Sequence, residues 1–299
     1  MARNRSPASA WRPAIAAPGF VKFGVALSRL NPRFHLEVTV EAERLGFESV
    51  WMADHLVFPM DGSGSPHPGE DTPPVPPSTP VFDVFGWLCF LAGKTSRIRL
   101  GTSVYLLGLR HPFTAARAVQ TLDLVSGGRA EIGIGAGWLR SEWKAAGLDP
   151  RTRGRRLDEA LAVCKRLWTE EVVEHRGEFF DFDPVMFEPK PVQKPWPPIH
   201  VGGESPAALR RAAFHGNGWY GLSHSLESAS EMAGRLAALR REAGREDEPF
   251  ELSLGGQLSE RDDIRRWEDV GVDRLVASPW ERSREAIDGL RRYADLVFG

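Results

Sequence analysis

Cysteines are scarce in this 299-residue chain: Cys89 and Cys164 are the two present, at no spacing typical of a metal site. Both stand in apolar, helix-like segments, a pattern typical of buried free thiols in a reducing cytosol. We therefore expect no disulfide, no bound metal and a cytoplasmic location.

Long apolar runs and long basic runs are also missing. No segment reaches the length that crosses a bilayer, so we expect no membrane partner. The 38 basic and 40 acidic residues nearly balance, which makes nucleic acid an unexpected partner. Residues 1–19 lack a continuous apolar stretch and are interpreted as a disordered N-terminal extension, not a secretory signal. Residues 20–299 contain no internal repeat, and we expect them to form one domain.

The chain does contain eight β-rich segments, most of them separated by helix-length stretches. They are residues 20–27, 48–53, 97–105, 130–136, 197–203, 218–222, 250–257 and 273–278. Several are nearly continuous apolar runs, as in parallel strands covered on both faces. Eight β-α steps predict an α/β fold, a (β/α)8 TIM barrel with its catalytic groups at the carboxyl ends of the strands. An open doubly wound sheet is the alternative, but FGVALSRLNP (23–32) has one glycine where that fold carries a dinucleotide signature.

Two segments interrupt this alternation. Residues 56–80 form a long Pro/Gly-rich loop after the second strand, on the presumed active face, and we expect it to act as a lid. Residues 171–191 predict a β-excursion before the fifth barrel strand, with strands at 172–175 and 178–182 around a turn at Arg176-Gly177. The sequence leaves open whether this excursion lies across the mouth or the bottom of the barrel.

Asp54 and His55 directly follow the second predicted strand. In a barrel both side chains can point into the mouth, where a histidine acts as general acid or base and the carboxylate orients or donates beside it. The structural alternative is an aspartate that caps local amides with the histidine packed at the rim.

Small residues end the third and fourth predicted strands. Gly101-Thr102-Ser103-Val104 would let a planar ring lie against the backbone, although ordinary β-propensity explains the same residues. The alternate glycines in the segment from Gly133 to Trp138, including Gly135, Ala136 and Gly137, would leave space for a ligand. A bulge or tight bend is the structural alternative.

The fifth predicted strand leads into Gly202-Gly203-Glu204-Ser205-Pro206 and then a helix. Ser205 suits the N-cap and Pro206 the first turn, and the free amides of such a helix end suit a phosphate. A capped helix that binds nothing is equally consistent. Similarly, His111-Pro112 is interpreted as the opening of the third helix.

A cluster of basic residues, Arg151, Arg153, Arg155 and Arg156, lies in the sequence RTRGRR. It can hold a polyanionic tail, but pairing with neighbouring carboxylates is the more common role of such a run.

Together these segments resemble the bacterial luciferase-like superfamily, and within it the coenzyme F420-dependent oxidoreductase branch. The resembling pieces are GFESVWMADHLV, RIRLGTSVYLLGLRHP, TLDLVSGGRAEIGIGAGWLRSEW, RGRRLDEALAVCKRLW and PPIHVGGESPAALRRAA, between about Phe20 and Trp219. The resemblance implies a TIM barrel, often a homodimer, with a flavin-like ring in the mouth. It also implies a non-prolyl cis peptide at a bulge of the third strand, which maps to Ser103-Val104.

The resemblance also implies roles for individual residues. Asp54 falls where relatives contact the deazaflavin headgroup, and His55 where they place a catalytic or substrate-side histidine. The segment Gly135 to Trp138 and Glu142 fall where relatives line the ring and its side chain. The segment Gly202 to Ser205 falls where they hold the phosphate.

Two departures from the pattern of the relatives limit these roles. Sugar-phosphate dehydrogenases of the superfamily have an acidic residue where this chain has Trp138, which counts against a sugar-6-phosphate substrate. Many relatives have aspartate where this chain has Asn217, and we expect that change to be structural.

Three functions compete. The first is an F420-dependent oxidoreductase that transfers a hydride between the deazaflavin and a small organic substrate, with His55 moving the proton and Asp54 binding and tuning the ring. The second is an FMN-dependent monooxygenase, since reduced flavin reacts with oxygen and a deazaflavin reacts poorly. The third is a non-catalytic barrel subunit, disfavoured because His55 and the glycines are present.

Overall fold

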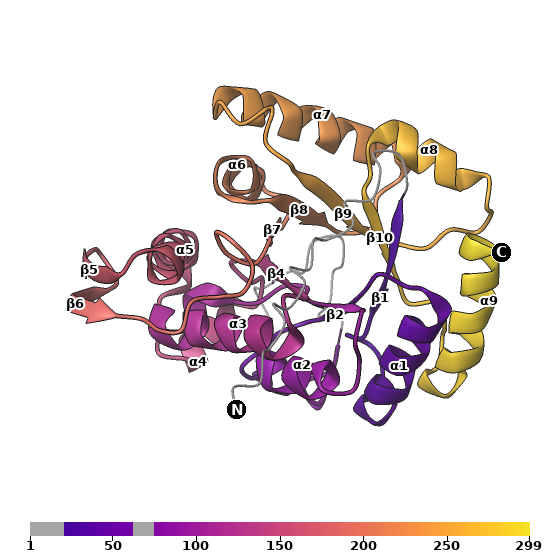
Figure 1. Cartoon of the computed structure of the whole chain (residues 1–299), viewed down its shortest axis with the longest axis horizontal. Helices are drawn as coiled ribbons and strands as arrows, with labels where there is room; N and C mark the ends of the chain where they lie inside the picture. Colours follow the sequence, from indigo (N-terminus) through magenta and orange to yellow (C-terminus); the bar gives the residue numbers. More distant parts are fainter. Residues whose placement is uncertain (1–20, 62–74) are drawn as a thin grey trace, which may run out of the picture.

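The computed structural model describes residues 21–61 and 75–299. Its barrel strands are β1 (Lys22–Ala26), β2 (Ser49–Met52), β3 (Arg99–Thr102), β4 (Ala130–Ile134), β7 (Ile199–Gly202), β8 (Gly218–Gly221), β9 (Glu251–Gly255) and β10 (Arg274–Ala277). They form a closed parallel barrel in the order β1-β10-β9-β8-β7-β4-β3-β2 (Figure 1). Each range predicted from the sequence contains one of these strands, so the predicted TIM barrel is confirmed.

Helices surround the barrel and alternate with its strands. They are α1 (His35–Leu45), α2 (Val84–Ala92), α3 (Pro112–Ser126), α4 (Arg140–Ala145), α5 (Arg153–Thr169), α6 (Pro206–His215), α7 (Leu226–Glu242), α8 (Asp263–Val270) and α9 (Ala286–Phe298). Short 3-10 turns cover Pro32–Phe34, Leu107–Leu109, Pro150–Thr152 and Ser283–Glu285. Helices α1 and α9 lie side by side, as do α2 and α3, so the first and last helices close the outer ring (Figure 1).

Local sequence signals explain where α3 and α6 begin. His111 caps α3 through its ring, which accepts the amide of Phe113 at 3.2 Å, and Pro112 takes the first helical position. Ser205 caps α6 in the same way, with its hydroxyl accepting the amide of Ala208 at 3.2 Å. Both predicted helix starts are confirmed.

The predicted β-excursion is an antiparallel hairpin of β5 (Val172–Arg176) and β6 (Asp181–Met186). It lies outside the barrel next to α5 (Figure 1). Glu159 of α5 fixes it there: its carboxylate lies 3.0 Å from Nε2 of His175 and accepts the amide of Phe180 at 2.9 Å.

Two predictions fall wholly or partly beyond the described part of the chain. The N-terminal extension (1–19) lies outside it, and so do residues 62–74 of the proposed lid. Among the helices that the structure does describe, none combines the length and apolar character needed to cross a membrane.

Candidate active site

A cavity of about 930 Å³ opens at the carboxyl ends of the barrel strands. Most of the residues predicted to form the site line it: His55, Ser103, Val104, Gly135, Ala136, Gly137, Trp138, Gly202, Gly203, Glu204 and Ser205. Three predicted residues, Asp54, Thr102 and Glu142, are buried in its wall instead. The fold therefore brings together segments that are far apart in the sequence, because all parallel strands of a barrel end on the same face.

Asp54 and His55, two and three residues after the end of β2, point in different directions. Asp54 is buried behind the wall, where its Oδ1 lies 2.7 Å from Nη2 of Arg110 and its Oδ2 accepts the amide of Leu106 at 2.9 Å. Burial raises the pKa of the Asp54 carboxyl, and Arg110 and the Leu106 amide oppose that rise. The expectation that both side chains point into the mouth is thus corrected: it holds for His55 alone.

His55 lines the cavity between two aromatic rings. Its ring centroid lies 4.4 Å from that of Phe58 and 6.1 Å from that of Trp138, which meets it edge-on at 81°. Its Nδ1 lies 2.9 Å from Oε2 of Glu142. The ring is thereby held in one orientation, with the opposite edge left for the cavity.

Glu142 and Thr102 do not line the cavity, although the sequence placed both in the cofactor site. Glu142 is fully buried in α4, where Oε1 accepts the amide of Leu56 at 2.6 Å. Thr102 is fully buried between strands, where its hydroxyl donates to the carbonyl of Gly133 at 2.7 Å. Both side chains hold the wall together, and their predicted contacts with a cofactor stay predictions.

The peptide bond between Ser103 and Val104 is cis, as the resemblance implied. The side chain of Val104 lies over the glycines of the neighbouring strand ends. A Cβ at Gly135 would lie 2.5 Å from Cγ2 of Val104, and a Cβ at Gly202 would lie 2.7 Å from its Cγ1. These two glycines therefore make room for a side chain of the protein itself as well as for a ligand.

The loop from Gly202 to Ser205 leads into the N-terminus of α6 at the edge of the cavity. Gly203 has a φ of 115°, a left-handed conformation that favours glycine. Within residues 21–61 and 75–299 the amides of Glu204 and Ser205 have no acceptor. The Glu204 carboxylate is turned away, accepting the amide of Leu222 at 2.9 Å, so the amides fit the phosphate of a flavin-type cofactor.

Two arginines lie beside this loop on the cavity wall. Arg211 pairs with Asp158, whose Oδ2 is 3.0 Å from its Nη2, while Arg153 donates to the carbonyl of Pro150 at 2.9 Å. Nη2 of Arg211 lies 3.4 Å from the Gly154 carbonyl, next to Arg153. Of the predicted basic cluster, Arg153 alone lines the cavity. Arg151 and Arg155 pair with carboxylates on the outside, and Arg156 donates to the carbonyl of Gly108 at 2.8 Å.

Sequence reasoning missed the cavity residues that carry no motif. Tyr220 is one, an inward residue of β8 that period-two alternation within GWYGL predicts in retrospect. Burial raises its pKa to about 12, and a hydrogen bond with Ser103 opposes the rise. Apolar residues with no local signal form one wall: Leu27, Leu30, Pro32, Met52, Phe58, Val75, Pro76, Pro80, Val81 and Phe82. Polar residues that carry no motif, among them Arg29, His35 and Arg140, also line the cavity.

A family model described as luciferase-like monooxygenase matches residues 15–295. The chain belongs to this family. Its barrel, the cis peptide and the cavity at the carboxyl ends of the strands are thus those of a luciferase-like protein, and the resemblance drawn from the sequence is confirmed.

Several relatives illustrate the range of this luciferase-like family. An uncharacterized protein of Mycobacterium tuberculosis is 28% identical over 260 residues, 86% of this chain and 88% of that protein. The F420-dependent glucose-6-phosphate dehydrogenase of Kineococcus radiotolerans is 35% identical over 186 residues, 61% of this chain and 50% of that enzyme. The solved structure of an F420-dependent secondary alcohol dehydrogenase matches with a TM-score of 0.76 at 17% identity, covering 93% of this chain and 98% of that one. This last likeness shows the fold.

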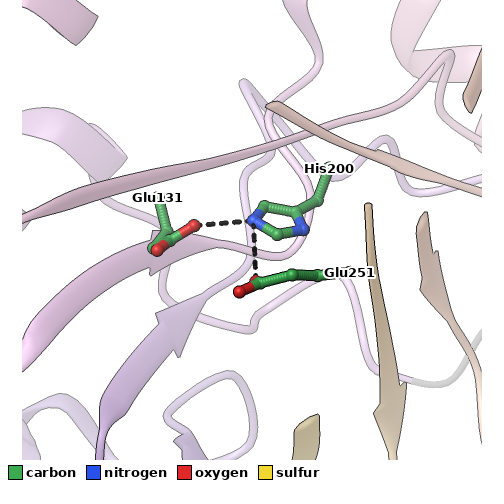
Figure 2. A group of neighbouring side chains, drawn as sticks. All are labelled: Glu131, His200 and Glu251. Atoms are coloured by element: carbon green, nitrogen blue, oxygen red, sulfur yellow. Dashed lines mark hydrogen bonds and ion pairs between the residues drawn. The ribbon is translucent and has the colours of Figure 1, made fainter. Parts of the chain in front are cut away.

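Beneath the cavity, the interior of this luciferase-like barrel holds a second polar group. Glu131, His200 and Glu251 offer oxygen and nitrogen atoms within 4.8 Å of one another (Figure 2). Nε2 of His200 lies 2.6 Å from Oε2 of Glu131 and 4.0 Å from Oε2 of Glu251. Carboxylates and a histidine grouped in this way can bind a metal ion, and the neighbouring charges decide whether these three do.

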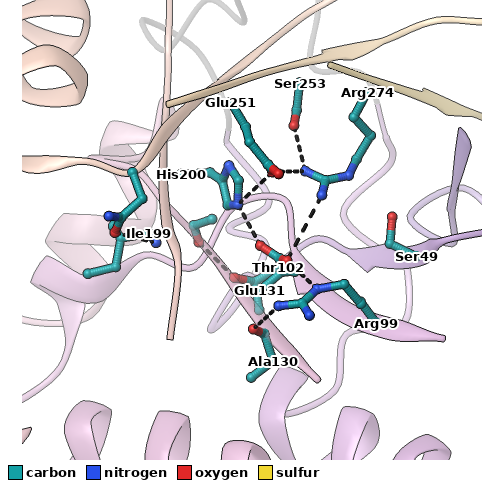
Figure 3. A network of polar contacts seen from close by, with 12 residues as sticks. Ser49, Arg99, Thr102, Ala130, Glu131, Ile199, His200, Glu251, Ser253 and Arg274 are labelled. Carbon is teal, nitrogen blue, oxygen red and sulfur yellow. Dashed lines mark hydrogen bonds and ion pairs between the residues drawn. The ribbon is translucent and has the colours of Figure 1, made fainter. Parts of the chain in front are cut away.

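Those surroundings already supply cations. Nη1 of Arg274 lies 3.0 Å from Oε2 of Glu251, and Arg99 pairs with Glu131 (Figure 3). Burial on its own would raise the pKa of Glu131, but Arg99 and His200 together hold it at about 2. Because guanidinium groups already face the carboxylates, a divalent ion would meet repulsion at its own ligands. We therefore interpret the group as a buried ion network of the barrel floor.

Trp51 lies between this network and the cavity residue Tyr220. Its ring centroid is 5.6 Å from that of His200 and 5.1 Å from that of Tyr220. The indole fills the barrel because Gly101 faces it, where a Cβ would lie 2.4 Å from an indole carbon. The charged floor is thus covered by an apolar plug.

Proposed function

We propose that this luciferase-like protein is a coenzyme F420-dependent oxidoreductase. The bound deazaflavin would supply hydride chemistry at its ring. The residues around it would bind and orient the cofactor and would exclude water from its ring. The amides of Glu204 and Ser205 would hold the phosphate, and the backbone from Ser103 to Val104 and from Gly135 to Gly137 would border the ring.

The observation that favours a deazaflavin is the position of Arg153. A single terminal phosphate is satisfied by the amides at the start of α6. Arg153 adds a cation beside them on the cavity wall, and within the described residues it makes no ion pair with a carboxylate. This second positive group suits a cofactor whose anionic tail continues past the first phosphate. The F420-dependent relative supports the same choice.

His55 is the residue we propose for proton transfer. It lines the cavity, and its Nδ1 edge is occupied by Glu142. The Nε2 edge therefore faces the ligand space, which is the arrangement a general acid or base requires. Asp54 would act indirectly, by fixing the strand end on which His55 stands.

The substrate we propose is small, apolar and without a phosphate. The apolar wall comes mainly from the ends of β1 and β2 and the segments that follow them. In the barrel order β1 stands opposite β7, which leads into the phosphate loop. Trp138 places an indole beside His55 where sugar-phosphate dehydrogenases place an acid. A sugar phosphate would have to bury its charge against these rings, at a large desolvation cost.

The test is a fluorescence titration of the purified protein with F420, with the same deazaflavin lacking its anionic tail, and with FMN. We expect micromolar binding of F420 and weaker binding of the tail-free form. Binding of FMN alone contradicts the proposal and favours the second candidate, a flavin-dependent monooxygenase, which the family description supports. Binding of none of the three favours a non-catalytic subunit.

A homodimer stays a prediction, which sedimentation checks directly.

A further inference from the structure

We propose that Glu142 is a positioning residue that fixes the tautomer of His55, with the proton on Nδ1 and a free lone pair on Nε2 toward the cavity. The catalytic consequence rests on the proposed function, whereas the tautomer itself does not. Glu142 would thereby control the proton-transfer group from inside the cavity wall.

The geometry of the Glu142 carboxylate carries this inference. The side chain comes from α4 and is fully buried, and both of its oxygens are in use. Oε1 accepts the amide of Leu56 at 2.6 Å and lies 3.4 Å from the amide of Val57. Oε2 lies 2.9 Å from Nδ1 of His55. The same carboxylate therefore holds the histidine and the first two residues of the segment that leaves it.

The direction of the hydrogen bond follows from donor and acceptor chemistry. A carboxylate that receives backbone amides is an acceptor, so the nitrogen opposite it must carry the hydrogen. In a neutral imidazole the other nitrogen is then unprotonated. Within residues 21–61 and 75–299 Nε2 has no hydrogen-bond partner, and the nearest rings, Phe58 and Trp138, are uncharged. Nε2 of His55 is thus a proton acceptor for a ligand in the cavity.

Glutamine at position 142 tests this assignment sharply. Its side-chain carbonyl would replace Oε1, because the amides of Leu56 and Val57 are donors that repel an NH₂ group. Its NH₂ group would then replace Oε2 and donate to Nδ1 of His55. Glu142→Gln should preserve the shape of the wall and move the imidazole proton to Nε2.

The decisive measurement is ¹⁵N NMR of the imidazole rings at about pH 8, above the ordinary titration range of histidine. The chain has eight histidines, and His55→Gln assigns the signal by its loss. We expect Nδ1–H in the wild type and Nε2–H in Glu142→Gln. An Nε2–H or doubly protonated ring in the wild type overturns the proposal, and so does an unchanged tautomer in the folded variant. If the variant fails to fold, the wild-type spectrum decides.

A matched control distinguishes a change in the His55 tautomer from the general effect of weakening a contact between a carboxylate and backbone amides. Glu43 of α1 is another carboxylate that accepts backbone amides, from Arg97 at 2.7 Å and Ile98 at 2.8 Å, and it contacts no histidine of the described part of the chain. Glu43→Gln should leave the His55 signal unchanged. A shift of that signal as large as the one in Glu142→Gln overturns a specific role for Glu142.

Kinetics give a second readout. Once turnover is established, Glu142→Gln should lower kcat roughly 10²–10⁴-fold, the usual contribution of a general base, and leave the KM of the substrate near that of the wild type. An unchanged kcat with an inverted tautomer overturns the catalytic part. If no cofactor binds, the proposed function fails while the tautomer measurement still decides the role of Glu142.

Discussion

Arg110 binds Asp54 inside the cavity wall, where neither side chain lines the cavity, with Nη2 of the guanidinium 2.7 Å from Oδ1 of the carboxylate. The residue after Asp54 is the cavity histidine. An ion pair in the wall thus fixes the backbone from which His55 reaches the ligand space.

Asp54→Asn should destabilise the protein without removing the cofactor site. The substitution leaves the Arg110 charge without its partner, and breaking a buried pair in this way costs roughly 3–5 kcal/mol. Urea unfolding checks the loss, and a fluorescence titration of the folded variant should give nearly the wild-type affinity. A large loss of affinity with intact stability would instead restore a direct cofactor contact for Asp54.

His55→Gln should abolish turnover and spare binding. Glutamine keeps the polarity and approximate size of the side chain but does not transfer protons near neutral pH, so we expect kcat to fall by roughly 10²–10⁴-fold. The dissociation constant of the cofactor, measured by fluorescence, should stay close to that of the wild type. Intact turnover would remove His55 from its proposed role, whichever cofactor binds.

Gly135→Ala should destabilise the strand ends through Val104. The added Cβ would lie 2.5 Å from Cγ2 of Val104, and overpacking of this kind typically costs about 1–3 kcal/mol. Adding Val104→Ala should recover part of the loss, because it removes the methyl in the way. Gly234→Ala in α7 is the matched control: its Cβ meets no atom within 4 Å, so stability should rise by up to about 1 kcal/mol. Equal effects of the two substitutions in thermal unfolding would contradict the contact.

Arg153→Ala should weaken binding of the deazaflavin that carries its anionic tail. Loss of one charge-assisted hydrogen bond, worth about 1.5 kcal/mol, corresponds to roughly a tenfold rise in the dissociation constant. The tail-free deazaflavin should bind unchanged. Arg151→Ala is the control two residues earlier, since that side chain is 90% exposed and paired with Asp149. Equal losses for both cofactor forms would rule out a tail contact.

Glu131→Gln should destabilise the barrel and change its response to acid. Removing the carboxylate takes from Arg99 its short ion pair and leaves it Glu48 at 3.9 Å and Gln193 at 3.1 Å. Breaking a buried pair costs up to roughly 3–5 kcal/mol. In the wild type the pKa of Glu131 is lowered from 4.5 to about 2 on folding. Its contribution is therefore complete above pH 4.5 and is lost as the pH falls toward 2. Urea unfolding across this range should show a shallower pH dependence in the variant. Identical slopes would mean that Glu131 is not the group responsible.

The spacing of apolar β-rich runs and the residues at helix starts are sufficient to predict the barrel. Apolar β-rich runs that recur with helix-length spacing predict the eight strands, and Pro112 and Ser205 mark helix starts through local backbone chemistry. The position of His55 in the mouth followed from the same rule, since the end of a parallel barrel strand lies on one known face.

The directions of the neighbouring side chains did not follow from that rule. Asp54, Thr102 and Glu142 stand in segments that line the cavity, yet each is turned into the wall by a partner far away in the sequence. The apolar wall and Tyr220 had no local motif at all.

The family, the barrel and the face on which the site lies thus follow from patterns repeated along the chain. Which polar groups reach the cavity depends on contacts made in the folded protein. A carboxylate turns toward whichever donors the folded chain places within about 3 Å of it, and for Asp54 and Glu142 those donors come from other segments of the fold.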